Sequence, residues 1–105
     1  KAWEAAPIRE DAEAGLWRAL VEQRLGRNAQ ALVGFRRAET VLERYPKEVQ
    51  AEFRIAKARA ALAQQDMTVA EREIARLTDF PEGLVEPDQL ALLRAMLDDA
   101  SGRPQ

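Results

Sequence analysis

The chain has 105 residues, of which 47% are apolar, and its 16 Lys plus Arg residues face 18 Asp plus Glu residues. These proportions are typical of one folded, soluble domain, and a net charge of -2 gives no positive field of the kind that nucleic-acid-binding proteins use. Histidine and cysteine are both absent, which excludes triads and dyads that need imidazole or thiolate and most zinc sites.

Alanine and leucine dominate the apolar residues, whereas strand-forming β-branched and aromatic residues are sparse, so the sequence predicts an all-α fold. No apolar run approaches the ~20 residues that span a bilayer, and no signal peptide is recognisable. Arginine far outnumbers lysine, as in GC-rich bacterial genomes. Because the sequence begins at Lys1 and ends in a turn, we expect a fragment of a larger bacterial protein, with the compartment, cytoplasm or periplasm, undecided.

Five helices are predicted in chain order. The first runs over residues 8–25, after Pro7, with apolar residues at helical spacing from Leu16 to Leu25 and a stop at Gly26. The second runs over 29–45, capped by Asn28 and ended by Pro46. The short connection between these two helices predicts an antiparallel hairpin.

Pro46 opens the third helix, which carries two apolar lines and therefore needs two neighbours. The fourth helix starts either with Asp66 as its cap or with a capping box of Thr68 and Glu71, and it ends near residue 78. The fifth helix runs over 87–100 and closes at Gly102.

Turn residues recur along the chain at intervals typical of stacked helical hairpins. Gly26-Arg27, Gln65-Asp66 and Gly102-Arg103 mark one kind of turn, and Tyr45-Pro46 and Phe80-Pro81 mark the other. Such a recurrence, with a period of about 34 to 40 residues, predicts a helical repeat protein.

The segment from Gly26 to Ala31, followed by Phe35 and Ala38, resembles the second-helix signature of the tetratricopeptide repeat (TPR) family. A second, weaker copy runs from Asp66 to Leu77, with Ala70 as the small residue and Ile74 in place of the aromatic. The resemblance departs in the first helix, where Val21 stands in place of a glycine. It implies a solenoid of stacked hairpins whose first helices line a concave binding groove.

The expected units are 1–7 as a linker or the end of a preceding unit, 8–46 as hairpin repeat 1, 47–82 as hairpin repeat 2, and 87–105 as the first helix of a third, truncated repeat. Gly34, inside a predicted helix, is interpreted as a site of close helix approach. The aromatic residues Trp17, Phe35, Tyr45 and Phe53 are interpreted as core. Arginines around the second helix, and paired carboxylates such as Asp98-Asp99, are interpreted as solvated side chains.

A polar line on the third helix is the candidate partner-binding surface, because the resemblance places first helices along the groove. Residues 47, 50, 54, 57 and 64 follow one another at near-helical spacing, and the first helix would extend their line. The candidate partner-binding residues are Arg18, Glu22, Lys47, Gln50, Arg54, Lys57 and Gln64, with Gln89 extending the line on the last helix. An acidic segment or a C-terminal carboxylate of another protein would suit Arg54 and Lys57.

The sequence therefore favours a protein–protein interaction module, a scaffold or adaptor that binds a peptide or protein segment on its concave face. No enzyme activity, catalytic residue, cofactor, metal or membrane insertion is expected. The alternative is a structural or oligomerisation spacer that stacks on itself or on neighbouring repeats. A more remote alternative is a nucleic-acid-binding helical domain, which the charge balance disfavours.

Overall fold

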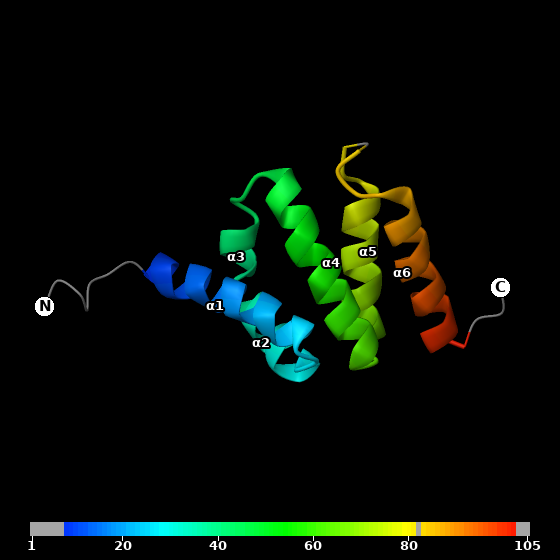
Figure 1. Cartoon of the computed structure of the whole chain (residues 1–105), viewed down its shortest axis with the longest axis horizontal. Coiled ribbons are helices and arrows are strands. Elements are labelled where there is room, and N and C mark those ends of the chain that lie inside the picture. The colour runs from blue at the N-terminus through cyan, green and yellow to red at the C-terminus, as the bar shows by residue number, and fades with distance from the viewer. Residues whose placement is uncertain (1–7, 82, 103–105) are drawn as a thin grey trace, which may run out of the picture.

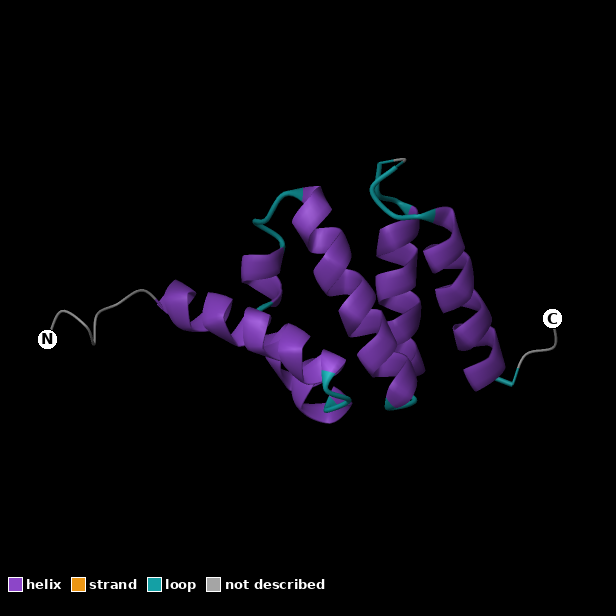
Figure 2. Cartoon of the chain, viewed as in Figure 1, coloured by secondary structure: helices purple, strands orange, loops and turns teal. Residues whose placement is uncertain are grey.

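A computed structural model describes the backbone of residues 8–81 and 83–102, with side chains from residue 13 onward. All regular secondary structure in this part of the chain is helical (Figures 1 and 2). The helices are α1 (Ile8–Arg24), α2 (Asn28–Arg37), α3 (Glu39–Leu42), α4 (Lys47–Ala63), α5 (Met67–Thr78) and α6 (Pro87–Ala100). The expected linker 1–7 lies outside the described residues. The predicted all-α class is confirmed.

Most predicted helix boundaries agree with the structure to within one or two residues, because local capping signals set them. Of the two starts predicted for α5, the structure has Asp66 as the N-cap, with its Oδ1 accepting a hydrogen bond from the Val69 amide at 3.3 Å. α1 and α6 are followed by Gly26 and Gly102, whose φ angles are +83° and +72°. Glycine adopts this left-handed conformation without strain, so it ends a helix readily.

The predicted second helix, 29–45, is wrong as a continuous element, so the described part of the chain forms six helices where five were expected. The chain breaks at Ala38, where φ is −100° and ψ is 11°, and α3 follows as a single turn. The carboxylate of Glu39, the first residue after the break, bonds to side chains of α4 and α5. These ion pairs favour the break over a straight helix, since alanine itself has no reason to interrupt one.

The helices pack as two hairpins and a final helix in one elongated body of 57 × 29 × 21 Å. α1 packs mainly on α2, and α4 packs mainly on α5. α4 also contacts both helices of the first hairpin, and α6 contacts α4 and α5 in the same way. Figure 1 shows α1 and α2 at one end of the long axis and α6 at the other.

A continuous core of Leu, Ala, Phe, Val and Ile side chains joins these helices. α4 packs against its neighbours through residues that include the fully buried Ala58, Ala60 and Ala61, whose small side chains allow the helices to approach closely. The interpretation of Gly34 as a close contact is confirmed, because a Cβ atom there would lie 2.8 Å from the Ala19 Cβ. That distance leaves no room for any side chain.

The assignment of the aromatic residues to the core is only partly correct. Phe35 and Phe53 are fully buried and meet edge to face with centroids 6.5 Å apart. Tyr45 is half-buried and donates a hydrogen bond from its hydroxyl to Glu13 Oε1 at 3.2 Å. Trp17 is 49% exposed and meets Phe53 in a T-shaped contact, with ring centroids 4.8 Å apart.

Candidate functional site

The polar line predicted to bind a partner does not form one exposed face. Gln50, Arg54 and Lys57 are 5%, 2% and 5% exposed, so the expectation that they face solvent is wrong. This side of α4 faces α3 and α5 and is covered by them, which places these three side chains in the interior. Arg18, Lys47 and Gln64 are exposed, and Glu22 is half-buried.

Five charged side chains from three helices form what we call the ion cluster: Glu39 of α3, Arg54 and Lys57 of α4, and Glu73 and Arg76 of α5. Arg54 donates from Nη1 to Glu73 Oε1 at 2.7 Å and from Nη2 to Glu39 Oε2 at 2.8 Å. Lys57 Nζ lies 3.0 Å from Glu39 Oε1 and 3.4 Å from Glu73 Oε2. Arg76 is the third cation that contacts Glu39, and it donates from Nη1 to Glu39 Oε2 at 2.8 Å.

Burial and opposite charge act against each other in the ion cluster. Burial by itself raises the pKa of Glu39, but hydrogen bonds and charge from Arg54 and Lys57 outweigh it and lower the pKa to about 2. Burial likewise lowers the pKa of Arg54, whereas Glu39 and Glu73 raise it above its ordinary value. Glu39 and Arg54 therefore stay ionised near neutral pH, and the ion pairs of the cluster hold α3, α4 and α5 together electrostatically.

Three of the predicted residues meet at a cavity of about 340 Å³ beside the ion cluster. Lys47, Gln50 and Arg54 line it, whereas Arg18, Glu22 and Gln64 do not. Gln50 donates its amide to the carbonyl oxygens of Glu43 and Tyr45 at 3.2 and 2.8 Å, which fixes the turn before α4. Its role is therefore structural, because its donors are already used.

A larger groove of about 460 Å³ lies where α1, α4 and the start of α6 meet, and we call it the α1–α4–α6 groove. Its lining consists of Leu20, Gln23, Arg24, Glu48, Ala51, Glu52, Ile55, Ala56, Arg59, Leu84, Val85, Glu86 and Gln89. Among the predicted residues, only Gln89, named as an extension of the line, belongs to it. The α4 residues of this groove lie on the side of the helix away from the ion cluster.

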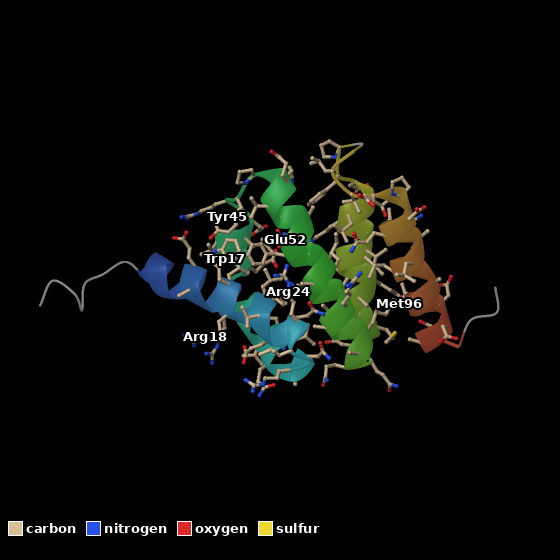
Figure 3. The ribbon with its side chains drawn as sticks, in the orientation of Figure 1. Trp17, Arg18, Arg24, Tyr45, Glu52 and Met96 are labelled. Carbon is tan, nitrogen blue, oxygen red and sulfur yellow. The ribbon has the colours of Figure 1, made fainter. Side chains whose placement is uncertain are left out.

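The groove combines apolar side chains with exposed charges. Ile55 and Val85 are half-buried and pack against the core, so each still presents apolar surface to the groove. Arg24 Nη2 and Glu52 Oε1 form an exposed ion pair at 3.0 Å, and Figure 3 shows these two side chains reaching toward each other from α1 and α4. Such a mixed lining is typical of surfaces that bind peptides.

Sequence reasoning missed the two carboxylates of the ion cluster, although the sequence held a signal for one of them. Glu73 lies three residues after Ala70 and four before Leu77, and both of these are buried. A carboxylate on the apolar face of a helix must find a cation when it is buried. Glu39 gave no such signal, because its position depends on the break at Ala38.

Among the described side chains, those of residues 13–81 and 83–102, no group of acidic residues is arranged to hold a metal ion. No helix in the same part of the chain is long and apolar enough to cross a membrane. Comparison of the chain with models of known protein families, with curated proteins and with solved structures finds no significant match.

Proposed function

We propose that the chain is a protein-interaction module, a TPR-like stack of helical hairpins that binds a segment of another protein in the α1–α4–α6 groove. The observation that carries the proposal is the groove itself, because it lies between the first helices of successive hairpins. Two features support the stacking. α4 packs on both helices of the hairpin before it, and α6 packs on α4 and α5 in the same relation.

The lining residues indicate how a segment would be held. Apolar side chains of the segment would cover Ile55 and Val85, while its polar groups would meet the exposed Glu48 and Arg59 at the sides. Micromolar affinity corresponds to a binding free energy of about −8 kcal/mol. A short segment reaches this value only if a few of its side chains fit the groove well.

The test uses peptides selected from a random display library against the 105-residue chain. Their affinities are then measured by calorimetry on the wild type, on the groove variant Glu48→Lys/Arg59→Glu, and on a control, Arg72→Glu. Arg72 is exposed on α5 and does not line the groove, so the control changes charge outside the groove.

We expect the groove variant to lose at least about tenfold in affinity, equivalent to about 1.4 kcal/mol, and the control to bind like the wild type. Both variants should stay folded, because all three altered side chains are exposed, and circular dichroism checks this. If the selected peptides bind the groove variant as tightly as the wild type, the groove is not the binding site.

A further inference from the structure

The charged side chains of the α1–α4–α6 groove are not evenly mixed along its length. Five charged residues line it: Glu48, Glu52 and Arg59 of α4, Arg24 of α1, and Glu86 just before α6. Arg24 and Glu52 pair with each other at 3.0 Å, so together they are neutral. The side chains of the other three form no ion pair with a described residue, and their charges remain for a bound segment.

The two unpaired carboxylates lie at one end of the groove. Glu48 is the second residue of α4, and Glu86 is the N-cap of α6. α4 and α6 begin at the same end of the helix stack (Figure 1). Each helix start offsets about half a charge, so this end keeps about one net negative charge. Lys47 does not neutralise it, because its ammonium lies over the Phe80 ring and lines the other cavity.

The unpaired cation lies further along the same wall. Arg59 follows Glu48 by eleven residues, which is about three turns of α4 and about 16 Å along its axis. Residues at this spacing share one face of a helix, and the half-buried Ile55 lies between them on that face. The α4 wall therefore changes from acidic at its start, through an apolar centre, to basic at Arg59.

We propose that the groove selects a segment that carries opposite charges at its two ends: a basic side chain beside Glu48 and Glu86, apolar side chains over Ile55, and an acidic side chain beside Arg59. This inference rests on the proposed function, because it names the kind of segment which that groove takes. A segment with the reverse order would bring like charges together at both ends, so the charge order fixes the direction of binding. The separation of about 16 Å corresponds to about five residues of an extended chain or about eleven of a helix.

The test exchanges the charge order on each side without changing either net charge. Peptides of about twelve residues, long enough for either conformation, are selected on the wild-type chain from a random library. One binder is also made with its basic and acidic residues exchanged. The groove variant Glu48→Lys/Arg59→Glu exchanges the charges of the protein and keeps its formal net charge of -2. Arg72→Glu, outside the groove, is the control.

The place of binding is measured separately, so that the two possible failures can be told apart. Proton–nitrogen correlation spectra of the wild-type chain are recorded during titration with each peptide. They follow the amide signals of Ile55 and Val85 in the groove and that of Arg72 outside it. This measurement locates the peptide without altering any charge of the protein.

We expect the selected peptides to shift the signals of Ile55 and Val85 and to bind the groove variant at least about tenfold more weakly than the wild type. The exchanged peptide should show the reverse preference, by about fivefold, because Glu86 keeps a negative charge at the altered end. Arg72→Glu should bind both peptides as the wild type does.

Three results would overturn the inference. Peptides that leave the signals of Ile55 and Val85 unchanged would overturn the proposed function, and the charge order with it. Peptides that shift these signals but lack the basic, apolar, acidic order would leave the groove as the binding site and overturn the charge order alone. An exchanged peptide that binds the wild type at least as tightly as it binds the groove variant would do the same.

Discussion

Glu73→Gln provides the sharpest test of the ion cluster. The Glu73 carboxylate is fully buried between Arg54, at 2.7 Å, and Lys57, at 3.4 Å. Glutamine keeps the shape of the side chain and one oxygen that accepts from Arg54, but it removes the negative charge. The cluster then holds three cations and only the Glu39 carboxylate. Because Arg54 and Lys57 are buried whereas Arg76 is 39% exposed, one positive charge in the interior lacks a counter-charge.

Removing one partner of a buried ion pair costs about 3–5 kcal/mol, and we place Glu73→Gln at about 3 kcal/mol because a hydrogen bond survives. A domain of this size is stable by about 5–15 kcal/mol, so the loss is a large share of the total. With a urea m value of about 1.5 kcal/mol/M, the midpoint of unfolding falls by about 2 M. The assay is urea unfolding followed by circular dichroism at 222 nm.

Glu52→Gln is the matched control, because it removes a carboxylate from an ion pair of similar length, 3.0 Å, whose side chains are 63% and 52% exposed. That pair should contribute less than about 1 kcal/mol. The double variant Glu73→Gln/Arg54→Met should cost less than the sum of its single changes, since removing both partners leaves fewer unpaired charges. Equal losses for Glu73→Gln and Glu52→Gln would refute the reasoning that burial gives the cluster its energy.

Three further predictions concern single positions. Gly34→Ala should lower the free energy of unfolding by about 1–3 kcal/mol despite a better helix propensity, because its Cβ would meet the Ala19 Cβ at 2.8 Å. Its control is Gly15→Ala, whose Cβ would meet nothing within 4 Å and which should raise the free energy of unfolding by about 1 kcal/mol. Equal effects of the two changes in thermal unfolding would contradict this reasoning. Asp66→Ala should cost about 1 kcal/mol in urea unfolding through loss of the α5 cap, and Asp66→Asn should restore most of it. The pKa of Glu39 is lowered from 4.5 to about 2, so its stabilisation is complete above pH 4.5 and is lost as pH falls toward 2. When the free energy of unfolding is measured between pH 4.5 and pH 2, it should fall by about 2 kcal/mol through protonation of Glu39, a figure that allows for solvent screening. In Glu39→Gln this part of the pH dependence should be absent.

Local signals predicted the helices well because they act over a few residues. Gly26 and Gly102 have the left-handed φ that ends a helix, and Asp66 caps the next one, so the boundaries of α1, α5 and α6 follow from the chain itself. The break at Ala38 has no such cause. It depends on Glu39 meeting Arg54 and Lys57, which lie at least fifteen residues further along the chain.

The candidate binding face was misplaced because helical spacing alone does not say which neighbour a polar line faces. α4 carries two polar lines: one includes Arg54 and Lys57, and the other includes Glu48, Glu52 and Arg59. Both have helical periodicity, and a net positive line looks like a binding surface. Only the positions of Glu39 and Glu73 decide that the first line is buried, and one of these two carboxylates depends on tertiary structure.

The ion cluster and the α1–α4–α6 groove lie on different sides of α4, and this relation connects stability with the proposed binding. If α4 rotated about its axis by one residue, about 100°, Arg54 and Lys57 would lose their carboxylates. Such a rotation leaves buried charges unpaired, and it also moves the fully buried Phe53 out of its place in the core, so both penalties oppose it. The cluster therefore fixes the rotation of α4 between its neighbours, and that rotation directs Glu48, Glu52 and Arg59 toward the groove. If the proposed binding in the groove holds, buried charged residues outside the groove thus determine which side chains a bound segment would meet.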